Sequence, residues 1–464
     1  MLKSTGFFNS ANVFNTSITC SLGAEVRLLS LTIILFLSVF NTARGQTVFG
    51  LKECIEIGLD RNFSIKIARN SETISTNNYT VGNAGFLPSL DLSGRYGGTL
   101  NDTRQNLTDG TQNVTNDVFN TTTNAGVTMG LTVFNGFSVQ TTYKKLNELK
   151  QVGELNTQLS IENLVANIIT GYYNYIENIQ LLNNLEYAVT LSKERLRIDE
   201  DRYLLGSSSK LQVLQSRVYL NSDSSRLSRQ FEVVRRAQIQ LNELMAVQDL
   251  AIEFITRDSD IVVDPSLIYE RLLEETLDKN TSLLISKSNK TISEYDYKLA
   301  VSRSYPYLNL TSGYSYNFNT FSSSSIKNQT TNGLNYGLTM GLTIFDGMNQ
   351  RRNIRNSSIE LQNRELRYLE LEQGVRADLI AIYSGYSNNL RLITLEEQNL
   401  ETATENLAIA MERYKLGSLS GIDLREVQKS LLDAKESLLS IQYQAKVAEI
   451  SLLLISGRIM DYYQ

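Results

Sequence analysis

Carboxylates are almost the only side chains in this chain that could perform chemistry. The sequence of 464 residues contains no histidine and two cysteines, Cys20 and Cys54. Without histidine, the Ser-His-Asp and Cys-His arrangements of nucleophilic catalysis are excluded, and so are most zinc sites. Pairs of Asp and Glu could still act as general acid and base. None of them stands in a Gly-rich or motif-bearing loop that would indicate a pocket. We therefore expect that the chain is not an enzyme and holds no cofactor or metal.

The N-terminal segment, residues 1–45, is predicted to be a signal peptide. An apolar run, Leu28–Phe40, follows Arg27 and precedes the small residues Ala43 and Gly45, after which cleavage is expected. The run has about 13 residues, which is too short to cross a bilayer as a helix.

Removal of this segment changes the cysteine content and the charge. Cys20 is lost and Cys54 remains alone, so we expect no disulfide within the chain. Gln46 stands where a lipid-anchoring cysteine would follow the apolar run, so no lipid anchor is expected. The segment holds three basic residues and one acidic residue, so its loss changes the net charge from −5 to −7. This charge argues against nucleic acid as a partner.

The elements that would position any site occur twice along the chain. At an offset of 211 residues, TMGLTVFNG (128–136) returns as TMGLTIFDG (339–347), and RYLLGSSS (202–209) returns as RYKLGSLS (413–420). Upstream, LDRN (59–62) returns as LDKN (277–280) at an offset of 218, so the first copy has seven additional residues between Pro88 and Thr128. A repeat of this length indicates a duplicated structural unit. We place the first copy at residues 46–265 and the second at residues 266–464.

Each copy opens with a helical stretch, residues 51–84 and 267–303, and continues with two segments of alternating polarity. In the second copy, Leu308, Leu310 and Tyr314 alternate with polar residues, as in a strand with one apolar face. We predict β-hairpins at about residues 88–135 and 306–346. The Asn-, Thr- and Ser-rich stretches 101–124 and 319–332 are predicted to be long connecting loops.

Two structures are compatible with these hairpins. One is an antiparallel sheet on a soluble core, and the other is a membrane β-barrel with lipid outside and a wet lumen inside. The polar faces rich in Asn, Thr, Ser and Gly, together with the signal peptide, favour the barrel. Four strands cannot close a barrel, and an open edge in lipid leaves backbone groups unpaired. The barrel must therefore be shared between several chains.

A long helical stretch follows each hairpin, at about residues 138–205 and 348–416. Neither stretch contains proline, and at about 1.5 Å per residue each spans on the order of 100 Å. Apolar residues recur at alternating spacings of three and four, as in Val165, Ile168, Tyr172 and Tyr175, which is a coiled-coil pattern. Helices of this length do not fit inside one compact domain, so we predict a long helical tube or bundle.

Both long helices are expected to end in Gly-Ser turns, residues 206–209 and 417–420. Glycine after the last helical residue predicts a left-handed cap, and serine before the next apolar-periodic run predicts an N-cap. Each long helix is therefore expected to reverse into another helix, at about residues 210–247 and 422–455. The linker 248–265 lacks helical periodicity and is interpreted as a small side element.

The signal peptide, the two helix–hairpin–long-helix–turn–helix copies and the turn motif Arg-Tyr-x-x-Gly-x-x-Ser together resemble the TolC-like outer-membrane efflux and secretion channels. The second turn, Arg413–Gly417 followed by Ile422-Asp423-Leu424, is similar to the family's Tyr-x-x-Gly and Asp-Val-Leu pattern. The resemblance covers the mature chain and implies a mixed α and β membrane protein. It implies a homotrimer with a twelve-strand β-barrel in the outer membrane of a Gram-negative bacterium and a periplasmic α-barrel of coiled-coil helices.

The resemblance further implies a function and partners. Small molecules or secreted proteins would leave the periplasm passively through the channel. A periplasmic adaptor and an inner-membrane pump of the resistance-nodulation-division or ABC type would work with it. The adaptor is implied to dock on the two turns, through Arg202, Tyr203, Gly206, Ser209, Arg413, Gly417 and Ser420.

The resemblance also implies a periplasmic gate in the second copy, formed by Tyr414, Asp423 and Glu426. Because the two carboxylates are three residues apart, they can lie on one helix face. Three chains would then place six carboxylates around the opening, which would favour cations. The alternative is that Asp423 is an ordinary residue at a helix start, where the helix dipole stabilises it.

The sequence departs from the family pattern at two positions. Leu419 stands where the family has a constricting arginine, and Gln212 stands where an acidic residue is frequent. Tyr414 must therefore contribute more of any closure. The alternative function is a periplasmic coiled-coil adaptor or scaffold without a pore. It would require compact Gly- and Val-rich domains beside a helical hairpin, and we find no such segment.

Overall fold

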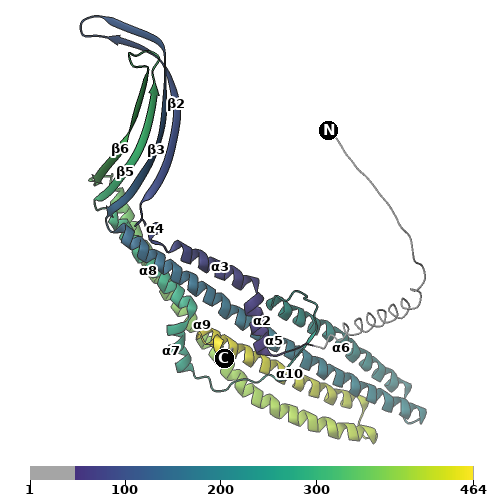
Figure 1. Cartoon of the computed structure of the whole chain (residues 1–464). Coiled ribbons are helices and arrows are strands. Elements are labelled where there is room, and N and C mark those ends of the chain that lie inside the picture. The colour runs from purple at the N-terminus through teal and green to yellow at the C-terminus, as the bar shows by residue number, and fades with distance from the viewer. Residues whose placement is uncertain (1–46, 463–464) are drawn as a thin grey trace, which may run out of the picture. The chain divides into compact units, whose positions relative to one another are not determined.

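The structure is a computed structural model that describes residues 47–462, so the predicted signal peptide lies outside the described residues. The described elements follow one another in the order β1 (Thr47–Phe49), α2 (Leu51–Arg61), α3 (Phe63–Asn78), α4 (Val81–Ala84), β2 (Ser89–Asn106), β3 (Gln112–Asn135), α5 (Ser138–Leu204), α6 (Lys210–Leu244), β4 (Phe254–Thr256), α7 (Tyr269–Lys279), α8 (Thr281–Ser302), β5 (Tyr307–Thr320), β6 (Asn328–Gly341), α9 (Asn349–Lys415), α10 (Gly421–Ile455) and a final 3-10 turn (Ile459–Tyr462) (Figure 1).

The described chain divides into two compact units. In the smaller unit, β1 pairs in parallel with β4, and the ring centroids of Phe49 and Phe254 lie 5.3 Å apart. The segment predicted as a linker therefore contributes a strand to a small element. The larger unit contains residues 50–252 and the residues from 258 onward.

The larger unit contains an antiparallel sheet in the order β2-β3-β5-β6. Its register aligns apolar residues across all four strands, because Leu92 pairs with Val127, Val127 with Tyr314, and Tyr314 with Leu334. All four side chains are exposed within one chain. β2 and β6 each have one unpaired edge, so the sheet is open in a single chain and suits a wall that several chains complete.

The predicted loops at residues 101–124 and 319–332 are too long, because strands occupy most of the first stretch and half of the second. β2 extends to Asn106 and β5 to Thr320, and the backbone ladder includes the pair Thr121 and Thr320. The side chains there are polar on both faces, so the period-two pattern that reveals a half-apolar strand is missing. The additional residues of the first copy lengthen its hairpin. β3 has 24 residues, whereas β6, its equivalent in the second copy, has 14.

The opening helical stretch of each copy is interrupted, which the sequence patterns did not predict. α2 and α3 are separated at Asn62, and α7 and α8 are separated at Asn280. Both asparagines have extended backbone, with ψ of 129° and 115°, and each caps the following helix with its side chain. Capping by asparagine starts a new helix, and apolar periodicity does not register such a break.

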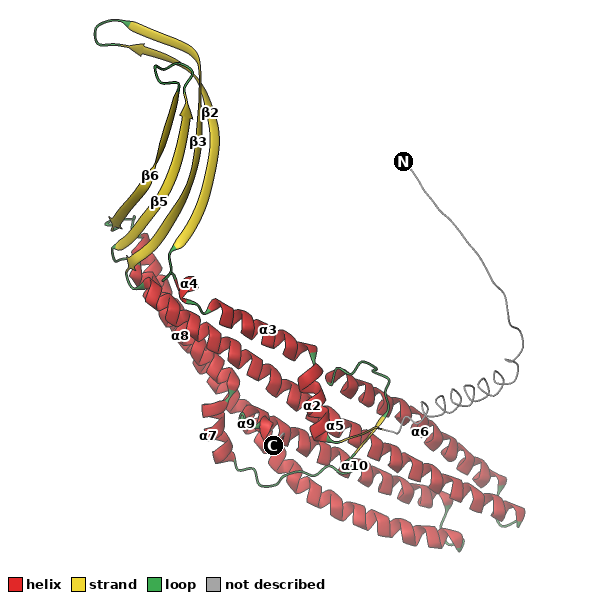
Figure 2. Ribbon diagram, viewed as in Figure 1, coloured by secondary structure: helices red, strands yellow, loops and turns green. Residues whose placement is uncertain are grey.

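The long helices α5 and α9, with 67 residues each, occupy the two long proline-free stretches. α3 and α6 pack against α5, whereas α8 and α10 each pack against both α5 and α9. Figure 2 shows these helices beside the two long ones. Val165, Ile168 and Tyr172 are fully buried, as the coiled-coil spacing predicts. α10 is long and apolar enough to cross a membrane by composition, but here it packs along α9 and α5.

α6 and α10 end in the same way, with one residue in the left-handed region. In α6 this residue is Ala246, with φ of 50°, and in α10 it is Gly457, with φ of 70°. The Ala246 N–H donates to the Glu243 carbonyl at 2.9 Å, and the Gly457 N–H donates to the Leu454 carbonyl at 3.1 Å. Glycine suits this position, whereas alanine is strained there.

Ala246→Gly is expected to raise the free energy of unfolding by about 1 kcal/mol, because left-handed backbone costs a non-glycine residue about 1–2 kcal/mol and the entropy of glycine offsets part of the gain. The midpoint of thermal unfolding of the purified protein measures this. The matched reverse change, Gly457→Ala, should lower the midpoint, since its Cβ would also lie 2.8 Å from the Lys279 backbone oxygen. A lower midpoint for Ala246→Gly would contradict the explanation.

Candidate functional site

Both turns adopt the predicted caps. Gly206 and Gly417 have φ of 74° and 81°, in the left-handed region. The Oγ of Ser209 accepts a hydrogen bond from the Gln212 N–H at 3.4 Å, and the Oγ of Ser420 accepts one from the Asp423 N–H at 3.2 Å. The turns therefore reverse α5 into α6, which we call the first hairpin, and α9 into α10, which we call the second hairpin.

Tyr414 connects the second hairpin to the first. Its side chain is buried, and its hydroxyl donates a hydrogen bond to Oδ1 of Asp199 on α5. The other oxygen of Asp199 accepts the hydroxyl of Ser216 on α6. Burial, together with the hydrogen bond to Asp199, raises the pKa of Tyr414. The hydroxyl therefore stays protonated and able to donate.

An arginine from the first hairpin also holds Tyr414. The Arg202 guanidinium donates to the Tyr414 carbonyl and lies 4.8 Å from the centroid of the Tyr414 ring. The tyrosine is therefore fixed at its backbone, its ring and its hydroxyl.

A second buried carboxylate holds α10 to α6. Arg425 donates from Nη1 to Oδ2 of Asp223 at 2.7 Å and from Nη2 to Oδ1 at 2.8 Å. The side chains are 19% and 1% exposed. Burial acts to raise the pKa of Asp223, but hydrogen bonds from Arg425 and Ser192 and the arginine charge outweigh it, so this pKa is lowered. Removing one partner of such a buried pair costs about 3–5 kcal/mol.

Arg195 of α5 lies between these two connections with few partners. It is fully buried, and its Nη1 donates to Oε1 of Gln428 at 3.5 Å. Its Nε and Nη2 have no hydrogen-bond partner within residues 47–462. Burial and the nearby Arg425 lower the pKa of Arg195. The Arg195 guanidinium carbon lies 4.6 Å from the centroid of the Tyr219 ring, whose face offsets part of the cost of burying the charge.

These groups form a single cluster between the hairpins, which we call the tip network. Its members are polar, nearly or fully buried, and drawn from α5, α6, α9 and α10: Arg195, Asp199, Ser216, Asp223, Tyr414 and Arg425. Apolar residues of three of these helices pack beside it, including Ile198, Leu407 and Leu424.

The predicted gate and docking residues differ in where they lie. Of the gate residues, Tyr414 is buried in the tip network, while Asp423 and Glu426 are exposed on α10. Asp423 accepts the Ser420 hydroxyl at Oδ2 at 2.8 Å, so it also has the helix-start role of the alternative interpretation. Of the docking residues, Tyr203 and Arg413 are exposed, whereas Arg202 reaches inward to the second hairpin.

Most of the tip network is not apparent from the amino-acid sequence. Asp199, Asp223 and Arg425 lie within helices and belong to none of the repeated motifs. One available signal was the core spacing itself, because Arg195 and Asp199 continue the spacing of three and four set by buried Leu185, Ala188 and Ser192. Charged residues on a core seam require partners.

The family model for outer membrane efflux proteins matches this chain twice, over residues 55–247 and 272–458. The chain belongs to the outer membrane efflux protein family. The double match agrees with the duplicated sequence. Membership places the chain in the outer membrane with a periplasmic tunnel. The family and the structural neighbours are channels rather than enzymes.

Relatives of known function and solved structures agree with this membership. The cation efflux system protein CusC of Escherichia coli K12 is 23% identical over 305 residues, which cover 63% of this chain and 64% of that protein. The match thus spans less than two thirds of this curated relative. A crystal structure of CusC has a TM-score of 0.74 at 18% identity, covering 88% of this chain and 92% of that chain. VceC from Vibrio cholerae has a TM-score of 0.71 at 16% identity, covering 88% and 96%. These two structures share the fold.

The ion pair of Asp223 makes the tip network sensitive to acid. Because the pKa of Asp223 is lower in the folded protein than the ordinary value of about 3.9, its contribution to stability is present above about pH 4 and is lost as the pH falls through the lowered pKa. Asp223→Asn should therefore lower the thermal midpoint at pH 7, and its difference from the wild type should shrink below about pH 4. Asp433→Asn, at an exposed position of α10, is the control. A difference that stays constant with pH would contradict this account.

Proposed function

We propose that this chain forms an outer-membrane channel through which small molecules or secreted proteins leave the periplasm. The observation that carries this proposal is the sheet, which has an apolar residue row across four strands and two unpaired edges. Three copies would supply twelve strands and leave no edge in lipid. The helices α5 and α9, with 67 residues each, would span about 100 Å of periplasm. The comparisons favour such a channel over an adaptor, scaffold or enzyme.

The gate in this proposal is the second hairpin, held shut by the tip network. Tyr414 and Arg425 connect that hairpin to Asp199 and Asp223 of the first hairpin. Breaking these contacts would free the second hairpin and would also return Arg195 to water. The two carboxylates therefore oppose opening. The contacts that hold the gate shut lie within one chain. This is consistent with Leu419, which stands where the family has a constricting arginine.

The turns support the proposed docking of a periplasmic adaptor. Leu204, Leu205 and Leu416 beside the turns are 81%, 83% and 82% exposed. Exposed apolar side chains of this kind mark interaction sites when they cluster. An adaptor that covers both turns would bury these leucines. The inner-membrane pump, of the resistance-nodulation-division or ABC type, would supply the energy.

The cargo proposed for the opening is cationic. Asp423 and Glu426 are exposed on α10, and carboxylate rings favour cations. The name of the relative CusC, a cation efflux system protein, supports the same direction. Within residues 47–462, no group of three His, Cys, Asp or Glu side chains is placed to hold a metal ion.

Loss of the tip network should open the channel. Tyr414→Phe combined with Arg425→Gln removes the hydrogen bonds to Asp199 and Asp223 and keeps the ring at position 414 with its Arg202 contacts. The conductance of purified trimers in planar lipid bilayers should then rise several-fold. Arg413→Gln, at an exposed position of the same turn, is the matched control. Wild-type protein that forms no channels would overturn the proposed function. Unchanged conductance of the double variant would overturn the gate alone.

Neutralising the exposed carboxylates should reduce selectivity. Asp423→Asn combined with Glu426→Gln keeps the size of both side chains and removes up to six charges from a trimer. The reversal potential in a salt gradient should then shift toward the value of a non-selective pore. Asp433→Asn, about two turns further along α10, should shift it less. Equal shifts would place the selectivity elsewhere.

A further inference from the structure

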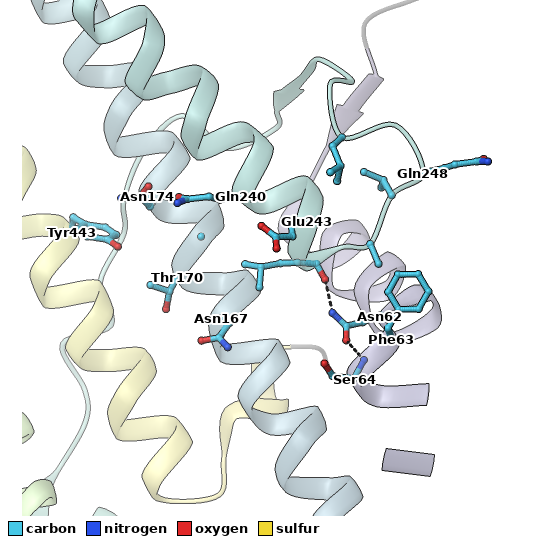
Figure 3. A pocket seen from close by; sticks show the side chains of 15 residues that line it. Asn62, Phe63, Ser64, Asn167, Thr170, Asn174, Gln240, Glu243, Gln248 and Tyr443 are labelled. Carbon is cyan, nitrogen blue, oxygen red and sulfur yellow. Dashed lines mark hydrogen bonds between the residues drawn. The ribbon is translucent and has the colours of Figure 1, made fainter. Parts of the chain in front are cut away.

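In each copy, one asparagine joins two helices end to end. Asn62 Nδ2 donates to the last carbonyl of α6, that of Leu244, at 3.0 Å, and its Oδ1 accepts the Ser64 N–H of α3 at 2.8 Å (Figure 3). Asn280 Nδ2 donates to the last carbonyl of α10, that of Ile455, at 2.9 Å, and its Oδ1 accepts the Leu283 N–H of α8 at 3.1 Å. We call these contacts joint 1 and joint 2.

The repeated motifs LDRN and LDKN end in these two asparagines. Helix ends leave carbonyls at one end and amide N–H groups at the other without partners. A side-chain amide carries both a donor and an acceptor, so one residue satisfies both helix ends. Aspartate at either position would keep the acceptor that caps the following helix and lose the donor to the preceding helix end. An Asn→Asp variant therefore tests the second role alone.

The joints differ in how tightly they are packed. Asn280 is 8% exposed, and the neighbouring Thr281 hydroxyl donates to the buried Glu162 of α5 at 2.8 Å. Gly457, just beyond α10, lies so close to Lys279 that an added Cβ would be 2.8 Å from its backbone oxygen. The cavity beside joint 2 is ≈ 440 Å³, whereas that beside joint 1 is ≈ 1160 Å³.

We propose that Asn280 is a positioning residue that acts as the pivot of α10 and sets the angle of the second hairpin. This inference rests on the proposed role of that hairpin as the gate. α10 is held at one end by joint 2 and at the other by the tip network. When the tip network releases, joint 2 remains, so the helix tilts about Asn280 instead of sliding.

The geometry gives α10 a long lever arm and α9 a place to bend. Lys429 lies about 39 Å along the helix from Ile455, so each 5° or so of tilt at joint 2 moves it by about 3 Å. In α9, Leu371 and Val375 line the cavity beside joint 2. Gly374, between them, lies in open space, because a Cβ added there would meet no described atom within 4 Å apart from its own turn of helix. Glycine within a helix weakens it, so α9 can bend beside the pivot.

Spin-label distances between the three copies of Lys429→Cys, at an exposed position of α10, test the pivot. Cys54 is fully buried, and burial, with Glu53 and Asp258 nearby, raises the pKa of its thiol to about 12, so we expect no labelling there. Asn280→Asp keeps the cap and breaks the bond to Ile455. It should broaden the distance distribution by a few ångström and raise the bilayer conductance. Asn62→Asp, the matched control at joint 1, should leave the Lys429 distances unchanged.

Two further variants keep the test decisive. If Asn280→Asp does not assemble, Asn280→Ser is judged by the same distances, since serine caps α8 but does not reach Ile455. Gly374→Ala should narrow the distribution by stiffening α9. Intact trimers with unchanged distances in the Asn280 variants would overturn the pivot. Because the distances do not depend on conduction, a wild type without channel activity would overturn only the proposed function.

Discussion

The structure depends on how the second helical hairpin is held against the first. The contact combines an apolar seam with two buried carboxylates, Asp199 and Asp223, that accept from Tyr414 and Arg425. A fully apolar contact of this length would keep most of its free energy when the helices shift slightly, because apolar contacts are not directional. Buried hydrogen bonds and ion pairs lose most of their energy when the geometry shifts, because the desolvated charges remain unpaired. The tip network therefore favours two discrete arrangements, closed and separated, over a continuous series.

The duplication explains how one motif supplies both sides of this contact. The Arg-Tyr pair occurs in both turns, but the copies use it in opposite ways. In the first copy Arg202 turns inward and Tyr203 is exposed, whereas in the second copy Tyr414 is buried and Arg413 is exposed. The carboxylates exist only in the first copy, since Ala410 and Ala434 stand at the positions equivalent to Asp199 and Asp223. The two hairpins thus contribute different residues to one interface: the first supplies the buried carboxylates, and the second supplies the Tyr414 hydroxyl and the Arg425 guanidinium that they accept from.

The sequence predicted elements whose signal is local and periodic. The long helices follow from the absence of proline and from the spacing of residues such as Val165 and Ile168, and the turns follow from Gly206 and Gly417. The strands beyond residue 101 were missed because polar side chains on both faces leave no alternation to detect. The breaks at Asn62 and Asn280 were missed because apolar periodicity does not register an asparagine cap, and because each asparagine also binds a helix end more than 170 residues away along the chain. Arg425 was missed for the same reason, since its partner Asp223 lies on another helix.

The central claim is that contact between α6 and α10 at Asp223 and Arg425 keeps the channel closed. The most direct measurement is the conductance of a variant that carries both Asp223→Cys and Arg425→Cys, before and after treatment with a short bifunctional thiol cross-linker. The account predicts high conductance before treatment, because the ion pair is gone, and a return to the wild-type level once the two helices are linked. Conductance that stays the same after complete cross-linking would contradict it.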